Sequence, residues 1–217
     1  MDKLLILGAT GRTGKWLVKE ALERGYLVSV LVRHPEKLDI TNKNLRVFTG
    51  LTTNKEIMEQ AIAGCSQVIS ALNISRHNDF PWSSLRSPKL LLSETMKVLI
   101  EAGRTAGIQK IIILSAWGVG DSRTEIPWWF SWLIDHSNIK YAYDDHARQE
   151  SLLINSEIDH LIIRPVGLTS GRAKMGIQES YQNYPAPKLT ISRRSLARWL
   201  IANLDRSFQS STVVVSD

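Results

Sequence analysis

Residues 4–25 read LLILGATGRTGKWLVKEALERG, in which an apolar run is followed by a glycine-rich turn and then an amphipathic stretch. The run from Leu4 to Leu7 is apolar throughout, which is typical of a strand buried on both faces in a parallel sheet. The amphipathic stretch predicts a helix from about Thr13 to Arg24, which Gly25 ends as a C-terminal cap. Because the turn between them is built from small residues, we expect its backbone to contact a ligand directly.

The same alternation of buried strands and helices continues along the chain. Strands are predicted in YLVSVLVR (26–33), LRVFTG (45–50), QVISAL (67–72), KIIILSA (110–116), IDHLIIRP (158–165) and STVVVS (211–216). Helices are predicted in NKEIMEQAIAG (54–64), from about Ser87 to Ala106, in DDHARQESLLINSE (144–157) and in SRRSLARWLIANL (192–204). We expect Asp144 and Asp145 at the positive N-terminal end of the third of these helices. The short links favour right-handed crossovers, so the predicted fold is α/β: a Rossmann-like, doubly wound parallel sheet in three α/β/α layers.

The length of 217 residues fits one domain, residues 1–217, better than two. Two stretches, Asn73–Ser87 and Gly167–Leu189, have no clear helix or strand pattern. Both follow predicted strands at the carboxyl edge, where open α/β sheets bind ligands. We therefore expect the walls of a substrate pocket to come from residues 73–87, 117–140 and 167–190.

The spacing of Gly8, Gly11 and Gly14 matches the turn that binds a dinucleotide. Gly8 permits the tight turn, Gly11 lets the backbone approach a pyrophosphate, and Gly14 lets the helix pack closely on the strand. The N-terminus of the helix offers N–H groups and positive potential to the phosphates. The turn is therefore predicted to bind a dinucleotide cofactor, with Thr10 and Thr13 among its contacts.

The end of the second strand indicates which dinucleotide is preferred. An NAD site usually has an acidic residue about 20 residues after the turn, where it holds the ribose 2′-hydroxyl group. Here Arg33 occupies that region, and a guanidinium can pair with a 2′-phosphate. Arg12, inside the turn, is a second candidate for the same phosphate. The sequence therefore predicts NADP(H) in preference to NAD(H), the alternative being that both arginines are ordinary exposed side chains.

Composition narrows the class of protein. Cys65 is the only cysteine, so an intramolecular disulfide is excluded and a reducing, cytoplasmic setting is expected. No apolar stretch reaches the ~20 residues that span a bilayer. The net charge of +6 comes from scattered basic residues, with only ISRRSLAR (191–198) close to a cluster, and we interpret these as a solvated surface rather than a nucleic-acid site. No metal site is predicted.

Several motifs occur in the order found in one protein family: GATGRTG, VLVRHPEKL, VISAL, SAWGVGDS, DDHARQE and IIRPVGLTSG. With them the chain resembles atypical short-chain dehydrogenase/reductases over nearly its whole length. It is most similar to the small NAD(P)-binding proteins around biliverdin reductase B (flavin reductase), and the NmrA-like proteins are more distant. Relatives often have an acidic residue after the glycine that closes the third strand, whereas Leu51 stands there in this chain.

The resemblance implies roles for individual residues. It places Ala71, Leu72 and Asn73 along the ribose of the cofactor and Ser115 against the nicotinamide. It also implies cofactor contacts at the nicotinamide end from Pro165, Val166 and Gly167, and it puts His146 near the mouth of the active site, with Ser115 and His146 as the catalytic candidates. Structural roles remain open, because Ser115 and Pro165 can simply end strands and His146 can be a polar helix residue.

One expected feature of short-chain dehydrogenases is absent. Their tyrosine and lysine lie four residues apart on a helix, where the lysine lowers the pKa of the phenol that donates a proton to a carbonyl. Here Ala147 follows Tyr143 at that spacing, and the one match, Tyr184 with Lys188, lies in a segment broken by prolines. A ketone that accepts hydride needs a nearby acid, whereas a conjugated acceptor spreads the charge and takes its proton from solvent.

The sequence therefore predicts an NADPH-dependent oxidoreductase that reduces a planar acceptor such as a flavin, a quinone or a tetrapyrrole, acting as a monomer or homodimer. The alternative is an NmrA-like regulator that senses NADP(H) without turnover. Four aromatic residues are candidate pocket walls that can stack on a planar ligand: Phe80, Trp82, Trp117 and Trp128. Tryptophans of this kind can equally belong to the core or to a dimer contact.

Overall fold

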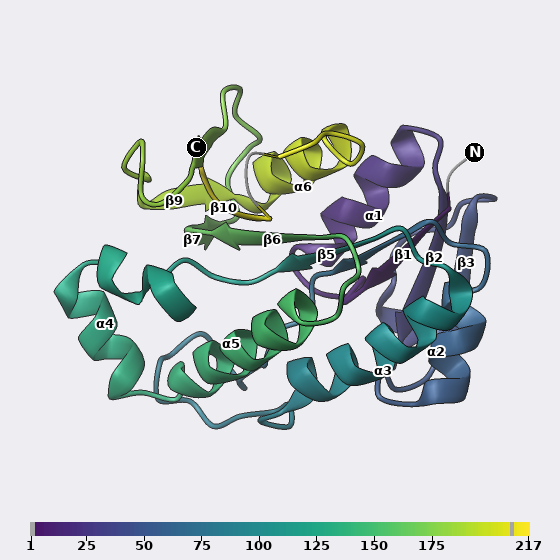
Figure 1. The fold of residues 1–217 in the computed structure, drawn as a ribbon, viewed down its shortest axis with the longest axis horizontal. Helices are drawn as coiled ribbons and strands as arrows, with labels where there is room; N and C mark the ends of the chain where they lie inside the picture. The colour runs from purple at the N-terminus through teal and green to yellow at the C-terminus, as the bar shows by residue number, and fades with distance from the viewer. Residues whose placement is uncertain (1–2, 209–210) are drawn as a thin grey trace.

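A mostly parallel sheet of eight strands forms the centre of the molecule, with helices on both faces (Figure 1). This computed structural model describes residues 3–208 and 211–217. The strand order is β3-β2-β1-β4-β5-β6-β10-β8, and the pairings are parallel except that β8 runs antiparallel to β10. The strands are β1 (Lys3–Leu7), β2 (Leu27–Val32), β3 (Leu45–Thr49), β4 (Gln67–Ser70), β5 (Lys110–Leu114), β6 (His160–Pro165), β8 (Gln178–Ser180) and β10 (Thr212–Ser216). The predicted Rossmann-like fold class is confirmed.

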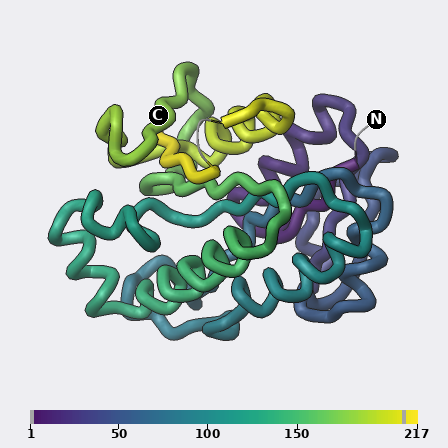
Figure 2. Tube along the Cα trace, in the orientation of Figure 1, coloured from purple at the N-terminus to yellow at the C-terminus, as the bar shows by residue number. Residues whose placement is uncertain are grey.

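The helices form two layers. Helices α1 (Gly14–Glu23) and α6 (Arg193–Ala202) pack on each other over one face of the sheet. Helices α2 (Lys55–Ile62), α3 (Leu91–Ala106) and α5 (Lys140–Ile154) pack side by side over the other, as Figure 1 shows. The short helix α4 (Trp128–Asp135) lies at the end of the molecule opposite to the first three strands (Figure 2). Two 3₁₀ turns, η1 (Pro35–Lys37) and η2 (Gly120–Glu125), complete the helical segments.

Strand β1 shows how the apolar sequence builds this sandwich. Side chains alternate between the two faces of a strand, so a central strand needs apolar residues at every position. Leu4 and Ile6 join the core under α1 and α6, while Leu5 and Leu7 join the core under α2, α3 and α5. All four side chains are fully buried. The same run that predicts a strand in the sequence thus holds the two layers of helices to one sheet.

The connections reverse direction between β1 and β4. From β1 the chain passes to β2 and then β3 on one side, and it returns to place β4 on the other side of β1. Ligands of open α/β sheets bind in the crevice that such a reversal opens at the carboxyl ends of the strands. Gly8 follows β1 and Ala71 follows β4, so the glycine turn lies at this crevice.

The structure corrects the sequence prediction in three places. Residues 167–189, which showed no pattern, contain β7 (Gly167–Thr169) and β8, and β7 pairs in parallel with β9 (Thr190–Ser192) as a separate small sheet. The helix expected from Ser87 begins at Leu91, after Pro88. Helix α5 begins at Lys140, so Asp144 and Asp145 lie in its second turn and not at its N-terminal end.

Candidate functional site

The structure shows why glycine stands at each of three positions in the opening turn. Gly8 has a φ of +79°, and a Cβ atom built on it would lie 2.7 Å from the carbonyl oxygen of Ala71. A Cβ atom on Gly14 would lie 2.0 Å from the carbonyl oxygen of Gly8. Gly11 has an ordinary φ, and its N–H donates to the carbonyl oxygen of Gly8 at 2.9 Å. Gly8 and Gly14 are therefore required by packing within the protein, whereas Gly11 leaves its outer side free for a ligand.

The N-terminus of α1 is suited to an anion. No side chain caps it, and its first turn contains no acidic residue. The positive end of the helix dipole and the N–H groups of its first turn therefore face the turn without a competing carboxylate from the same helix. This is the arrangement that binds phosphate groups at helix N-termini.

A cleft of about 870 Å³ lies against the turn. Its volume falls in the range of small-molecule and cofactor sites. Nine of the residues predicted to contact the cofactor line it: Gly8, Thr10, Gly11, Arg12, Thr13, Arg33, Ala71, Leu72 and Asn73. These residues come from three separate segments, after β1, β2 and β4, and the fold brings them to one cleft.

The part of the cleft beyond β2 and β3 contains the expected phosphate partner. Arg33 directly follows β2 and its side chain is exposed. Leu51, at the position where relatives often have an acid, also lines the cleft and is 56% exposed. Next to it, the buried hydroxyl group of Thr52 shares a 2.7 Å hydrogen bond with that of Thr95 on α3, which fixes this wall of the cleft.

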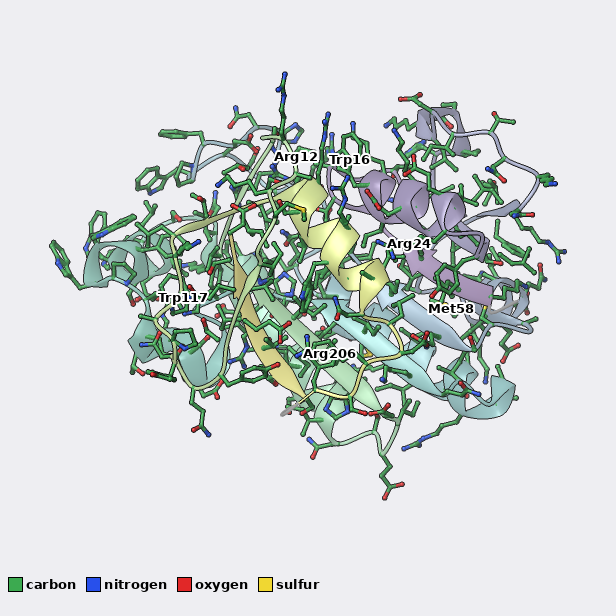
Figure 3. The ribbon with its side chains drawn as sticks, turned by 90° about the horizontal axis from the view of Figure 1, so that it is seen from above. Arg12, Trp16, Arg24, Met58, Trp117 and Arg206 are labelled. Atoms are coloured by element: carbon green, nitrogen blue, oxygen red, sulfur yellow. The ribbon has the colours of Figure 1, made fainter. Side chains whose placement is uncertain are left out.

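Arg12 makes a contact that the sequence did not reveal. Its two terminal nitrogens each donate to one carboxylate oxygen of Asp79 at 2.8 Å, across 67 positions of sequence. Asp79 belongs to the segment Asn73–Ser87, so this ion pair ties that segment to the glycine turn. In Figure 3 Arg12 projects at the edge of the molecule, beside one end of α6.

The predicted nicotinamide-end residues follow β5 and β6. The amide of Ser115 donates to the carbonyl oxygen of Ile163 at 2.8 Å, and its buried hydroxyl has no hydrogen-bond partner among the described residues. Val166 is buried, and the amide of Gly167 donates to the carbonyl oxygen of Leu189 at 3.1 Å. Ser115, Pro165, Val166 and Gly167 do not line the 870 Å³ cleft.

Helix α5 buries two consecutive polar residues with different surroundings. Asp145 is fully buried, and its carboxylate accepts hydrogen bonds from the amide of Leu92 at 2.7 Å and the hydroxyl of Ser93 at 2.5 Å. It therefore caps the N-terminus of α3, which has no side-chain cap of its own. His146 is 2% exposed, does not line the cleft, and has an Nδ1 atom without a partner in the described part of the chain. Burial lowers its pKa, so the imidazole is neutral at pH 7.

Tyr143, one turn before His146, is not an activated phenol. Its hydroxyl group donates to the carbonyl oxygen of Trp117 at 3.2 Å. Burial raises its pKa to about 12. The residue four positions later is Ala147, so no lysine lies beside it on the helix. Tyr184, the other tyrosine considered, is 82% exposed and lies in the segment between β8 and β9.

The four aromatic candidates for the pocket walls have different positions, and none lines the cleft. Trp117 is 7% exposed in the core, and its Nε1 donates to Glu125 at 3.3 Å (Figure 3 labels it). Phe80 and Trp82 form an exposed ring pair with centroids 5.2 Å apart. Trp128 on α4 is 82% exposed. Trp82 also donates from its Nε1 to the carbonyl oxygen of His136, which joins the Asn73–Ser87 segment to the end of α4.

Comparisons with known proteins identify the family of the chain. A model of the NAD(P)H-binding family matches residues 8–207. The chain belongs to this NAD(P)H-binding family. It is 28% identical over 202 residues to the oxidoreductase GME11367 of Pestalotiopsis microspora, an alignment that covers 85% of this chain and 76% of that protein.

Solved structures share the fold over the whole chain. A short-chain dehydrogenase/reductase from Veillonella parvula in complex with NADP is 18% identical with a TM-score of 0.79, covering 100% of this chain and 94% of that one. ChuY, an anaerobillin reductase from Escherichia coli O157:H7, is 19% identical with a TM-score of 0.77, covering 99% and 96%. The resemblance to atypical short-chain dehydrogenase/reductases is confirmed, and the relative from Pestalotiopsis microspora is itself named an oxidoreductase. In residues 3–208 and 211–217 no helix is both long and apolar enough to cross a membrane.

Sequence reasoning missed part of the cleft lining. Arg76, Asp79 and Arg86 line it from the segment 73–87, which was expected to form a pocket wall, although none of them was singled out. Arg193 lines it from outside every expected wall. The signal for Arg193 was present in ISRRSLAR, which we interpreted as solvated surface. Arg193 begins α6 after β9, so only the pairing of β9 with β7 brings it to the cleft.

Proposed function

We propose that this protein is an NADPH-dependent reductase that transfers a hydride to a planar conjugated acceptor such as a flavin, a quinone or a tetrapyrrole. The proposal rests on the raised pKa of the Tyr143 phenol and its hydrogen bond to a backbone carbonyl, together with the cleft beside the glycine turn. A short-chain dehydrogenase that reduces simple carbonyls needs a phenol with a lowered pKa at this helix. In this protein the phenol has a raised pKa, donates to a backbone carbonyl and has Ala147 in place of the lysine.

The other polar groups near this helix do not replace that acid. His146 is neutral at pH 7 because burial lowers its pKa, and a neutral imidazole is a weak acid. Asp145 is occupied by the N-terminus of α3. A substrate whose reduced form spreads its negative charge over a conjugated system needs no such acid, because water can supply the proton. The proposed acceptor class matches what the residues of this site can do.

The residues present fit the proposed cofactor. The glycine turn leaves Gly11 free of a side chain, and the uncapped N-terminus of α1 faces the same space. Buried polar atoms normally have a partner, and the Ser115 hydroxyl has none among the described residues. We propose that Ser115 contacts the nicotinamide end, with Pro165, Val166 and Gly167 beside it, and that His146 supports this end as a neutral polar group. When bound, the reduced nicotinamide supplies a hydride from C4.

The preference for NADP(H) over NAD(H) is part of the proposal. Arg33 lines the cleft at the end of β2 and has no acidic partner in the described part of the chain. A guanidinium in this position matches the geometry of a phosphate group. Arg12 is the second proposed partner, once its ion pair with Asp79 opens.

The test is oxidation of NADPH by the purified protein, followed by absorbance, with acceptors of different chemistry. We expect oxidation above the protein-free rate with a flavin or a quinone. Simple aldehydes and ketones should be poor acceptors, because no tyrosine–lysine pair supplies their proton. The variant Tyr143→Phe should keep most of the activity, since its hydroxyl only donates to the Trp117 carbonyl oxygen.

Two results would contradict the proposal. Rapid reduction of an ordinary ketone, lost in Tyr143→Phe, would show that the phenol is the acid after all. Tight NADPH binding without oxidation by any flavin, quinone or tetrapyrrole would favour the sensor alternative, in which the protein binds the cofactor and signals to a partner.

A further inference from the structure

The cleft is lined by basic side chains to which the proposed cofactor site assigns no role. Six arginine and lysine side chains line it, against two acidic ones. The basic residues are Arg12, Arg33, Lys37, Arg76, Arg86 and Arg193. Of the two acids, Glu94 pairs with Lys97 on its own helix at 2.8 Å, and Asp79 pairs with Arg12. Arg12 and Arg33 are the proposed partners of the cofactor's phosphate, which leaves Lys37, Arg76, Arg86 and Arg193 without an assigned role.

The contacts of Asp79 show that the arginines of the cleft can hold a carboxylate group. Its carboxylate receives both terminal nitrogens of Arg12 at 2.8 Å. Hydrogen bonding and charge attraction from Arg12 lower the pKa of Asp79, and the positive charges of Arg76 and Arg193 lower it further. This carboxylate is therefore held by Arg12 and lies in the electrostatic field of Arg76 and Arg193, and it belongs to an exposed residue of the Asn73–Ser87 segment.

Arg76 and Arg193 lack acidic partners of their own. Within residues 3–208 and 211–217 neither lies within 4.0 Å of a carboxylate oxygen. The Nε atom of Arg76 is buried without a hydrogen bond, and Arg193 only contacts the hydroxyl of Ser170 at 3.4 Å. Buried donors of this kind normally have a partner, and a partly buried guanidinium favours an anion.

Strand order places these two arginines on the acceptor's side of the cleft. Arg33 follows β2, on one side of β1, whereas Arg76 follows β4, on the other side. Arg193 follows β9, whose partner β7 continues from the end of β6. The proposed nicotinamide-end residues follow β5 and β6 on that same side. A group bound by Arg76 and Arg193 would therefore lie away from Arg33 and on the side of Arg12 and Asp79.

We propose that Arg76 and Arg193 bind an acid group of the hydride acceptor, a carboxylate or a phosphate, and that Asp79, held by Arg12, competes with this group for their positive charge until the acceptor enters. The acceptor is then a planar molecule with an anionic side chain rather than a neutral one. This inference rests on the proposed function for the identity of the ligand as an acceptor, but the anion site itself can be tested by binding alone.

The test compares FMN with riboflavin, which share one ring system and differ by a phosphate group. Binding of each flavin to the protein loaded with NADP⁺ is followed by quenching of flavin fluorescence, so no turnover is needed. FMN should bind at least about tenfold more tightly than riboflavin, because a hydrogen bond between charged groups contributes about that factor or more. Raising the ionic strength should reduce this difference.

Variants of Arg193 and of Asp79 give opposite predictions for the binding of FMN. Arg193→Gln should weaken FMN binding about tenfold and leave riboflavin binding unchanged. Asp79→Asn should strengthen FMN binding several-fold, because the internal carboxylate no longer competes. Arg24→Gln is the matched control: Arg24 follows the far end of α1, well away from Arg12 in Figure 3, and should change neither affinity.

The outcomes separate this inference from the proposed function. Equal affinities for FMN and riboflavin would overturn the inference, as would a parallel loss of NADP⁺ affinity in Arg193→Gln, which would assign the site to the cofactor. Selective binding of FMN that depends on Arg193, without any oxidation of NADPH, would support the anion site and contradict the reductase.

Discussion

At the scale of single residues, the glycines of the turn divide into two kinds. Gly8 and Gly14 are in steric contact with the protein's own backbone, so they are conditions for the fold. A Cβ atom on Gly11 would lie 3.1 Å from the carbonyl oxygen of Gly8, a tight contact that a small shift relieves. The proposed reason for glycine at position 11 is therefore contact with the cofactor's pyrophosphate.

This difference predicts opposite effects of the same substitution. Gly14→Ala should lower the free energy of unfolding by roughly 3 kcal/mol or prevent folding, because the new methyl group overlaps a backbone carbonyl. Gly11→Ala should change stability by about 1 kcal/mol or less but weaken NADPH binding at least about tenfold. Urea denaturation and a titration of tryptophan fluorescence with NADPH measure the two effects. A Gly11→Ala protein that binds NADPH like the parent would mean that the turn is only structural.

At the scale of elements, the contact between α5 and α3 is the least expected feature. The sequence suggested that Asp144 and Asp145 interact with the dipole of their own helix. Instead Asp145 crosses to α3 and caps the helix whose first residues, Leu90, Leu91 and Glu94, form part of the cleft wall. One buried carboxylate thus fixes the position of a wall of the cofactor site.

Two neighbouring substitutions test this cap. Asp145→Ala should lower the free energy of unfolding by about 1–3 kcal/mol, since it removes the acceptor for the Leu92 amide and the Ser93 hydroxyl group. Asp144→Ala, on the exposed side of the same turn, should change it by about 0.5 kcal/mol or less. Urea denaturation compares the two variants, and equal losses of stability would show that the cap contributes nothing.

The elements also show how far sequence reasoning reached. Buried strands such as Leu4–Leu7 and the glycine turn are local patterns, so the fold and the residues after β1, β2 and β4 could be predicted. Arg76 and Arg193 could not be placed, because their position depends on strand pairing between β7 and β9 and on the path of the Asn73–Ser87 segment. The residues next to an arginine in the sequence do not determine such long-range contacts. The local sequence around an arginine is therefore similar whether it lies on the surface or in a cleft.

At the scale of the whole molecule, the parts of the cleft on the two sides of β1 differ in structure. On the β2 and β3 side the cleft offers Arg33 and the residues after β3, which suits the adenosine end of a dinucleotide. On the β4, β5 and β6 side it meets the Asn73–Ser87 segment and the small β7–β9 sheet, which differ from the regular first half of the chain. We therefore propose that the regular half of the molecule binds the cofactor and that the irregular half binds the acceptor.

The central claim is that this protein is an NADPH-dependent reductase, and one measurement tests it most directly: kcat/KM for NADPH and for NADH, with FMN as acceptor, in the parent protein and in Arg33→Asp. The parent should turn over NADPH with a kcat/KM at least about tenfold above that for NADH, which is the effect expected from the proposed pairing of Arg33 with the 2′-phosphate. In Arg33→Asp that preference should disappear or invert, while Arg24→Asp should leave it unchanged. Equal values for the two cofactors in the parent would contradict the role of Arg33, and the absence of turnover with either would contradict the reductase itself.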